Sequence, residues 1–519
     1  MTIMILGAGI MQVPAIRIAK EEGWRVICAD GNDKAPAVGD VDQFLHIDLK
    51  DLSGLEKAAR EIKESEGLDG VFTAGTDFSA SVAWVAEKLG LPGIKYHNAL
   101  NATDKIRMRS YFREHGVSSP DFSELSEGMD FLQEISSMEF PLVVKPVDSM
   151  GARGVKKIND SGELNRAVEN AIRYSRTERA IVEEFIEGEE FSVDALVYNG
   201  EVTIYGLAIR HIFFPPYFIE MGHTMPAPID PAKKKAIEDE FIKGIKALGI
   251  DNGAAKGDII FSEKGPVIGE IAARLSGGYM SGWTFPLASE VESTKGAMQI
   301  ALGLQPDQYD GSYKKTSAER AFLSIPGTIK TIELIEEAYD TEFVKDLFLR
   351  VEEGDKVDFP VNNVEKCGNI ISCHLQRDKA VKSAETACAK ILITLDETDK
   401  RTGDFIYGDK SWPGDAFNLN NYNNISFYDE ICESVDFAYD DLHFEQFRPV
   451  KMPDISFETA TDWQGRKIVD VYNQVIEITG MTEIDDIINR RAQALFWRSI
   501  IKGSIQGGLW FFDRFCSKS

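Results

Sequence analysis

A strand-like run that ends in a lysine and leads into a loop of small residues is the strongest chemical feature of the sequence. Leu142 to Lys145 is apolar up to its lysine, and the loop Ser149 to Gly154 follows. Glycines let backbone N–H groups approach an anion closely, the Ser149 hydroxyl adds a donor, and Lys145 adds a positive charge. The segment predicts a phosphate-binding loop, although a surface hairpin with a chance lysine has the same pattern. It does not match G-x-x-x-x-G-K-[ST], so it is not a P-loop.

Two acids on neighbouring strand-like runs form a second candidate. Asp258 and Glu270 lie on either side of the turn Glu263-Lys264-Gly265. Adjacent antiparallel strands can present both carboxylates on one side, and such a pair suits Mg2+ (or Mn2+), which takes oxygen ligands and is completed by nucleotide phosphates. Arg274 would then stabilise charge on an acyl phosphate or a tetrahedral intermediate. An edge acid with a structural arginine is the simpler interpretation of this hairpin alone.

An acidic link between two further strand-like runs is a candidate nucleoside site. It lies within Val182 to Asp194. Backbone groups around Glu184 to Ile186 could pair with an adenine edge, and a nearby carboxylate could accept hydrogen bonds from ribose hydroxyls. Taken alone, the run is more simply a solvated charged turn.

The N-terminal part of the chain alternates between strand-like and helix-like segments, which would help to position the candidate site residues. Thr2 to Leu6, Val13 to Glu22 and Arg25 to Ala29 form a β-α-β pattern, which predicts a doubly wound α/β domain over the first ~100 residues. The Gly7-x-Gly9 sequence imitates a dinucleotide fingerprint. Because Gln12 occupies the place of the third glycine, NAD binding is disfavoured.

The rest of the chain changes character twice. From Thr103 onward, helices separated by paired strand-like runs predict an α+β region, and a smaller α+β unit follows at about 310–395. Beyond Asp396 the composition shifts, with an asparagine-rich loop at 418–424 and a final helix expected from about Thr482. That helix is basic and amphipathic, which suits a membrane surface, but a core or oligomer face is favoured.

Composition and charge narrow the class of protein. The 519 residues include 57 Lys plus Arg and 84 Asp plus Glu, for a net charge of -27, which would repel nucleic acid. The length predicts several domains. Six scattered cysteines form no zinc-like spacing, and no run approaches the roughly 18 apolar residues of a membrane span. The N-terminus lacks a basic leader, so we expect a cytoplasmic protein without a membrane partner, compatible with a homodimer.

Taken in order, these segments resemble the ATP-grasp superfamily over residues 1 to about 395. The similarity is greatest to carboxylate-amine ligases that join amino acids, with carbamoyl-phosphate synthetase and purine-pathway carboxylases as more distant relatives. It implies a mixed α/β and α+β fold, with domains as follows: a Rossmann-like pre-ATP-grasp domain at 1–102, an ATP-grasp domain at 103–309 whose small nucleotide-binding lobe spans Lys145 to Phe191, and an α+β lid at 310–396. An additional region, 397–519, lies outside the resemblance.

The resemblance also implies roles for individual residues. ATP would be bound by a set of phosphate, adenine and ribose contacts: Lys105, Lys145, Ser149, Gly151, Gly154, Glu183, Ile186 and Glu190. Asp258 and Glu270 match the metal-binding acids, and Glu270 and Arg274 would be catalytic. One position departs from many members, because Ala272 replaces an asparagine that supplies a further metal ligand, so the second magnesium would be held more loosely.

The substrate side is less well defined by the sequence. Thr76 and Asp77 follow a strand and would face the cleft, whereas Glu220 or His223, in the aromatic stretch Phe213 to Pro226, could meet an amine nucleophile. A buried structural histidine is the plainer interpretation of His223.

The predicted reaction is activation of a carboxylate as an acyl phosphate by ATP, followed by attack of an amine with release of ADP and phosphate. Two alternatives remain open from the sequence. One is a bicarbonate-using carboxylase or a carbamoyl-phosphate-synthetase-like enzyme, and the other is a non-catalytic ATP-binding module.

Overall fold

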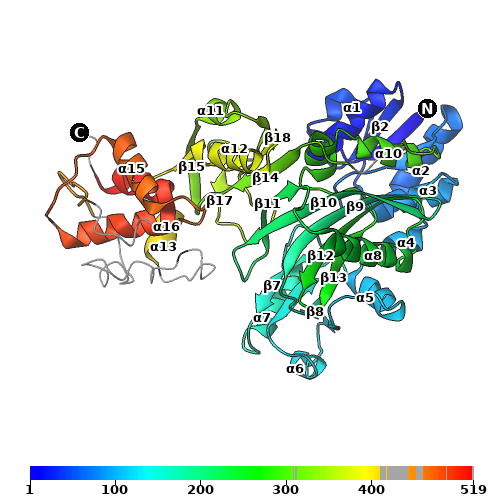
Figure 1. Ribbon diagram of the computed structural model, residues 1–519, viewed down its shortest axis with the longest axis horizontal. Coiled ribbons are helices and arrows are strands. Elements are labelled where there is room, and N and C mark those ends of the chain that lie inside the picture. Colours follow the sequence, from blue (N-terminus) through cyan, green and yellow to red (C-terminus); the bar gives the residue numbers. More distant parts are fainter. Residues whose placement is uncertain are drawn as a thin grey trace. The chain divides into compact units, whose positions relative to one another are not determined.

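The computed structural model describes residues 1–307, 309, 312–408, 417, 442–451, 460–486 and 488–516 (Figure 1). The asparagine-rich loop expected at 418–424 lies outside the described residues. The chain forms two compact units. The first contains Met1–Ile212, Glu220–Glu319 and Ile371–Val381, and the second contains Phe213–Ile219, Arg320–Ile370 and Lys382–Ser519. The domain limits at 102, 309 and 396 remain predictions beside this division.

A parallel sheet of four strands begins the first unit. Its strand order is β3-β2-β1-β4, formed by β1 (Thr2–Leu6), β2 (Arg25–Asp30), β3 (Gln43–His46) and β4 (Gly70–Phe72). Alternation along β1 divides its side chains between two cores: Ile3 and Ile5 pack with α1 (Val13–Glu21), whereas Met4 and Leu6 pack with α2 (Leu52–Ser65) and α3 (Ser79–Leu89). Helices therefore cover both faces of the sheet, as the β-α-β pattern predicted.

A glutamine fills the loop that imitates a dinucleotide fingerprint. The Gln12 side chain is buried, and its Nε2 donates to the carbonyl of Ala74 at 2.5 Å. A Cβ at Gly7 would lie 3.0 Å from the Gln12 side chain, so this amide occupies the space beside the loop. The residue at the place of the third glycine thus fills the loop with its own side chain.

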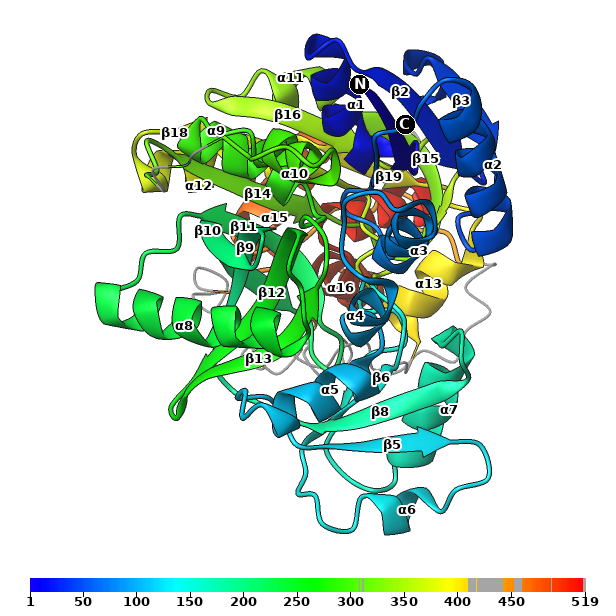
Figure 2. The same ribbon diagram turned by 90° about the vertical axis from the view of Figure 1, so that its right-hand side faces the viewer.

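A small antiparallel sheet follows in the first unit. Its order is β5-β8-β6-β7, formed by β5 (Phe122–Ser126), β6 (Leu142–Pro146), β7 (Lys156–Ile158) and β8 (Arg179–Glu184). Helix α7 (Leu164–Tyr174) packs its apolar side against β6 and β8, with α6 (Phe131–Glu134) beside β5 (Figure 2).

The larger sheet of the first unit positions most of the predicted site. Its strands β13-β12-β9-β10-β11 are neighbours in that order, and β14 and β18 continue it. They span β9 (Glu189–Tyr198), β10 (Glu201–Phe213), β11 (Ile219–Met225), β12 (Gly253–Ser262), β13 (Gly265–Ala272), β14 (Thr316–Phe322) and β18 (Gly368–His374). The hairpin expected at Glu263-Lys264-Gly265 joins β12 to β13. The aromatic stretch Phe213 to Pro226, in which Glu220 or His223 was expected to meet an amine, is partly strand, because β11 takes up its second half.

Alternation along β9 gives this sheet one apolar and one polar face. Phe191, Val193 and Ala195 pack with α5 (Lys105–Glu114) and α8 (Pro231–Ala247), and Figure 2 shows α8 lying along β12 and β13. The side chains between them are polar and point to the opposite face: Glu190, Ser192 and Asp194. Three further helices complete the first unit: α4 (Tyr96–Asn101), α9 (Phe285–Ser289) and α10 (Ser293–Ala301).

The second unit contains a three-stranded sheet in the order β17-β15-β19 and several helices. The strands of this sheet are β15 (Gly327–Glu333), β17 (Lys356–Val357) and β19 (Leu392–Leu395), and the strand β16 (Val344–Leu349) lies outside it. The helices are α11 (Ile335–Tyr339), most of α12 (Arg377–Lys390), α13 (Lys400–Tyr407), α15 (Ile468–Thr479) and α16 (Arg490–Phe515). Within the described residues, no helix has both the length and the hydropathy needed to cross a bilayer.

Helix α16 corrects one expectation and agrees with another. It begins at Arg490 and not near Thr482, because the Asn489 side chain accepts a hydrogen bond from the N–H of Ala492 and caps it there. Residues 492–512 are buried within the second unit. The basic Arg498 is buried too, and its guanidinium donates to the carbonyls of Ile406 and Tyr407. The helix is therefore part of a core, as favoured.

Candidate functional site

The polar face of the larger sheet brings the two predicted metal acids together. Asp258 on β12 and Glu270 on β13 are cross-strand partners, and Ser192 on β9 pairs with Asp258 from the other side. The adjacent row of the sheet contains Asp194, Lys256 and Ala272. The predicted adjacency of the two acids is thus confirmed, whereas their role as metal ligands remains a prediction.

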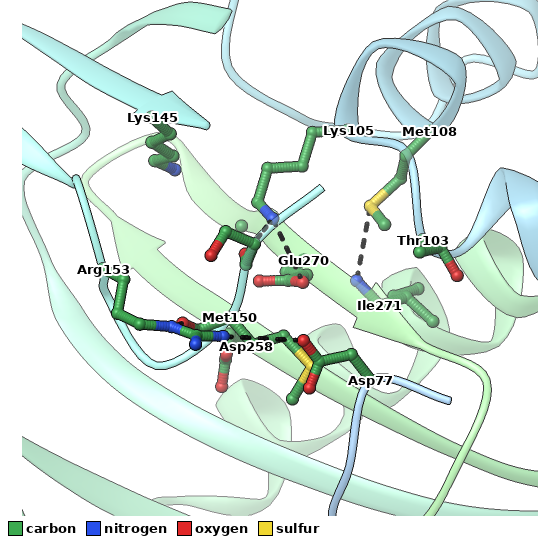
Figure 3. Close-up of polar contacts among 12 residues, drawn as sticks. Asp77, Thr103, Lys105, Met108, Lys145, Met150, Arg153, Asp258, Glu270 and Ile271 are labelled. Carbon is green, nitrogen blue, oxygen red and sulfur yellow. Dashed lines mark hydrogen bonds and ion pairs between the residues drawn. The ribbon is translucent and has the colours of Figure 1, made fainter. Parts of the chain in front are cut away.

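Lys105 lies at the first turn of α5, where it reaches both Glu270 and the predicted phosphate loop. Its Nζ donates to the carbonyl of Ser149 at 3.0 Å and lies 3.6 Å from Glu270 Oε1 (Figure 3). Asp104 caps the helix by accepting from the N–H of Arg107, and this fixes the direction in which the lysine leaves the helix. The side chain of Lys105 is buried, so its ammonium depends on these two oxygens.

The electrostatic surroundings of Glu270 favour its charged form. Burial alone would raise the pKa of this carboxyl, but the charges of Lys105, Lys256, Lys145 and Arg274 lower it to about 2. Glu270 is therefore ionised at every physiological pH, as a ligand of a divalent cation must be.

Three charged side chains form a buried ion-pair triad between the small sheet and α5. Glu183 on β8 receives a hydrogen bond of 2.6 Å from the Nζ of Lys145 on β6, and its other oxygen lies 2.8 Å from Nη2 of Arg109 on α5. Burial alone would raise the pKa of Glu183, but Arg109 and Lys145 hold it below its ordinary value. Glu183, predicted at the adenine hinge, thus orients the phosphate-binding candidate Lys145, and Arg109 is a partner that the sequence did not indicate.

A single arginine links three carboxylates on the polar face. Arg210 on β10 donates to Glu220 at 2.9 and 2.7 Å and to Glu190 at 3.1 Å, and its Nη1 lies 3.1 Å from Asp258 Oδ1. Burial alone would lower the pKa of Arg210, but Asp258, Glu220 and Glu190 raise it. Burial raises the pKa of Glu190, against the effect of Arg210. The predicted ribose acid and the predicted metal acid therefore share one cation.

Arg210 and Lys256, which forms an ion pair with Asp258, were missed from the sequence. A signal was present, because Glu190, Ser192 and Asp194 place polar residues at alternate positions of an otherwise apolar strand. Such a polar stripe in a central strand implies counter-charges on the neighbouring strands.

The predicted phosphate loop contains two glycines in the left-handed region of backbone conformation. Gly151 and Gly154 have φ values of +71° and +70°, and a Cβ on Gly154 would lie 2.8 Å from the Tyr174 ring. Asp77, between β4 and α3, lies 3.6 Å from Arg153 of this loop (Figure 3). It also lies 2.9 Å from Arg176. Asp77, proposed from sequence as a substrate contact, thus forms an ion pair with this loop, and its role toward a substrate remains a prediction.

Six of the predicted residues line one small cavity in the first unit. Lining residues include the following predicted positions: Thr76, Asp77, Lys105, Ser149, Glu270 and Arg274. Arg274 is 9% exposed, and its Nη1 donates to the carbonyl of Leu275 at 2.8 Å. Ala272 also lines this cavity, so the side chain that differs from many resembling proteins faces the same space.

Other predicted residues lie outside that cavity's lining. Lys145, Glu183, Glu190, Asp258 and Glu220 belong to the ion-pair networks described above. Ile186, which is partly buried, lies in the link between β8 and β9. His223 is fully buried on β11, where Nδ1 lies 3.2 Å from Glu319 Oε2 and Nε2 is 3.1 Å from the Thr284 hydroxyl, so it matches the structural interpretation.

The chemistry of the donor set fits magnesium. Asp258 and Glu270 supply hard carboxylate oxygens on one face, and both carboxylates are neutralised by cations that could turn to nucleotide phosphates instead. Among the residues that the structure describes, no three His, Cys, Asp or Glu side chains form a preassembled metal cluster. Mg2+ is usually bound by one or two protein carboxylates, and phosphate oxygens of the substrate complete its coordination.

Three family models match the chain. A model described as ATP-grasp N-terminal domain matches residues 16–93, one described as ATP-grasp domain matches residues 138–282, and one described as L-amino acid ligase C-terminal domain 2 matches residues 321–396. Together they follow the order expected from the sequence.

Individual proteins are also similar to parts of this chain. An uncharacterised protein of Sinorhizobium fredii is 24% identical over 332 residues, 63% of this chain and 68% of that protein. The alanine–anticapsin ligase of Bacillus subtilis is 29% identical over 241 residues, which are 42% of this chain and 50% of that ligase. The crystal structure of L-amino acid ligase from Bacillus licheniformis has a TM-score of 0.66 at 22% identity, covering 76% of this chain and 98% of that one, and shows a shared fold.

Proposed function

We propose that this chain, which belongs to the ATP-grasp superfamily, is an ATP-dependent carboxylate-amine ligase. The observation that carries the proposal is the convergence of Lys105, Ser149, Glu270 and Arg274 around one cavity. A cation, a loop hydroxyl, a carboxylate and an arginine are the groups needed to bind a nucleotide's phosphates beside an activated acyl group.

The nucleotide would lie along the small sheet and the polar face of the larger one. Lys105 and Lys145 would bind its phosphates, with the Ser149 to Gly154 loop closing over them. The link containing Ile186 would contact adenine through its backbone, and Glu190 would accept hydrogen bonds from the ribose. Since Glu183 is buried beneath Lys145, we assign it to orienting that lysine.

The metal would be held by Asp258 and Glu270. When bound, Mg2+ neutralises phosphate charge and orients the phosphates for in-line transfer. The cations that contact these acids, Arg210, Lys256 and Lys105, would then turn toward the phosphates, because their carboxylate partners acquire a divalent counter-charge.

The reaction has two covalent steps. An oxygen of the substrate carboxylate attacks the γ-phosphorus of ATP, the bond to ADP breaks, and an acyl phosphate forms. The neutral amine then attacks the acyl carbon, the carbon–oxygen bond to phosphate breaks, and phosphate leaves with one former carboxylate oxygen. Arg274, at the edge of the cavity, would stabilise the charge that develops on the acyl oxygen.

The substrates are proposed to be small molecules of the amino-acid class. The support is the L-amino acid ligase model over residues 321–396 and the similarity to an alanine–anticapsin ligase. Thr76 and Asp77 line the cavity from the N-terminal part of the first unit and would face the substrate. The bond formed is therefore proposed to be an amide between two amino-acid-like partners.

An ADP-release assay on the full chain with ATP, Mg2+ and pairs of amino acids tests this function. We expect release that requires both a carboxylate and an amine, loss of release in Glu270→Gln, and little change in the matched control Glu263→Gln, whose exposed side chain lies on the β12–β13 turn. Release that requires bicarbonate alone would instead identify a carboxylase-type enzyme. Tight ATP binding without release under any condition would identify a binding module.

A further inference from the structure

A buried aspartate on the polar face is used by none of the contacts proposed above. Asp194 lies in the middle of β9, is 2% exposed, and pairs in register with Lys256 on β12. Its other cross-strand partner is Gly206, which has no side chain to cover it. The carboxylate therefore points from the sheet toward the segment that follows β13.

That segment is anchored on Asp194 through Ser276. Both the hydroxyl and the backbone N–H of Ser276 donate to Asp194 Oδ1, the latter at 3.3 Å. From the other side, the Ser276 carbonyl accepts a hydrogen bond of 2.8 Å from the Ser281 hydroxyl. The neighbouring Leu275 forms a parallel bridge with Ala74, at the end of the strand that leads to Thr76 and Asp77.

Arg274 lies two residues before this anchor and has little support of its own. Its Nη1 donates to the carbonyl of the adjacent Leu275 at 2.8 Å, and its Nη2 lies 3.7 Å from the Met150 sulfur, a weak acceptor. The direction of its guanidinium therefore depends on the path of the backbone between β13 and Ser276.

We propose that Asp194 is a positioning residue, which fixes the turn containing Ser276 and thereby holds the Arg274 guanidinium in the cavity. The role assigned to Arg274 rests on the proposed ligase function, whereas the anchoring of the turn does not. Asp194 itself touches neither substrate nor nucleotide in this scheme.

The energetics of Asp194 indicate a functional role and not only a stabilising one. Its Oδ2 has no hydrogen-bond partner among the described residues, and burial raises the pKa of this carboxyl to about 6. The charged or titratable groups that face it are Lys256, Arg274, Tyr205 and Tyr313. A carboxylate held ionised in a buried site is costly for folding, so stability alone gives no reason for an aspartate here.

Five variants separate positioning from general damage: Asp194→Ala, Asp194→Asn, Ser276→Ala, Arg274→Ala and the double variant Asp194→Ala/Arg274→Ala. Asp194→Ala removes the anchor, and we expect kcat to fall by about tenfold or more with KM for ATP changed by less than about twofold. Asparagine retains an acceptor for Ser276 and should restore most of the activity. Ser276→Ala, which keeps the N–H donor, should be intermediate.

The double variant gives the most specific outcome. If Asp194 acts through Arg274, Asp194→Ala/Arg274→Ala should be no slower than Arg274→Ala alone. Losses that multiply, or a kcat unaffected by Asp194→Ala, would overturn the proposal. The matched control is Asp230→Ala, an exposed aspartate that also accepts two backbone hydrogen bonds, at the start of α8, and its loss should lower Tm without slowing turnover.

An independent readout applies even if the chain does not turn over any tested substrate pair. Amide hydrogen exchange of the peptide covering residues 273–281 should be faster in Asp194→Ala than in the parent, and Asp194→Asn should restore protection. Unchanged exchange in Asp194→Ala would refute the anchoring itself. Failure of wild-type ADP release with altered exchange would refute only the proposed ligase function.

Discussion

Asp258 and Glu270 are cross-strand partners, yet they form ion pairs with different cations: Arg210 and Lys256 pair with Asp258, and Lys105 pairs with Glu270. The two carboxylates thus lie between cations from two elements: Arg210 and Lys256 of the larger sheet, and Lys105 of α5. A nucleotide bound there would place its phosphate groups beside these cations. A divalent metal could then bind the two carboxylates in place of the cations.

Removing Arg210 should destabilise the first unit. Arg210→Ala leaves Glu190, Glu220 and Asp258 as neighbouring carboxylates without their shared counter-charge, and we expect a loss of about 3 kcal/mol or more in the free energy of unfolding. Arg210→Lys, which keeps the charge but not the fork of donors, should lose less. Denaturant unfolding at pH 7 measures both. Equal stability of the alanine variant and the parent would contradict the network.

Glu183 should contribute to acid sensitivity. Because Arg109 and Lys145 hold its pKa below the ordinary value of 4.5, its ionised form stabilises the fold at and above that pH, and this contribution is lost as the pH falls below it. Glu183→Gln should therefore be less stable than the parent at pH 7 and show a smaller further loss between pH 5 and about 3. Unfolding curves across this range test it, and parallel pH profiles would count against the triad.

Gly154 should be intolerant of any side chain. Its φ of +70° is strained for other residues, and a Cβ would come within 2.8 Å of the Tyr174 ring, so Gly154→Ala must move the phosphate loop. We expect KM for ATP to rise by about tenfold. Gly128→Ala is the control, since Gly128 has φ +88° but open space around it, and it should reduce stability without affecting ATP. Similar KM values for both variants would argue against the loop's role.

Asp77 should restrain the phosphate loop through its ion pairs. In Asp77→Asn, Arg153 and Arg176 lose their shared partner, so trypsin should cleave after Arg153 faster than in the parent. Raising the salt concentration should reduce the difference, because both arginines are well exposed and screened. Equal cleavage rates at low salt would show that Asp77 does not hold the loop and would leave a substrate contact as its proposed role.

The parts of the fold that were predictable from the sequence depend on local patterns. The β12–β13 hairpin follows from two apolar runs around Glu263-Lys264-Gly265, and its register then pairs Asp258 with Glu270. The resemblance to the ATP-grasp superfamily is likewise confirmed, because models described as ATP-grasp N-terminal domain and ATP-grasp domain match residues 16–93 and 138–282 in the expected order.

Non-local pairing explains what was missed. Arg210 and Lys256 look like ordinary strand residues until β9 pairs with β10 and β12, and no single sequence reveals that register. Asp194 was passed over for the same reason, since its partner Ser276 is distant in the chain. The predicted start of the final helix, near Thr482, was wrong. The helix begins after Asn489, whose side chain caps it, and asparagine acts as an N-cap only in some contexts.

Transfer of a labelled oxygen tests the central claim most directly. A substrate acid labelled with oxygen-18 in its carboxylate, incubated with ATP, Mg2+, an amine and the full chain, should give inorganic phosphate that contains one labelled oxygen for each amide formed, and Glu270→Gln should give none. That result follows only if the carboxylate becomes an acyl phosphate. Amide formation with unlabelled phosphate would contradict the proposed chemistry.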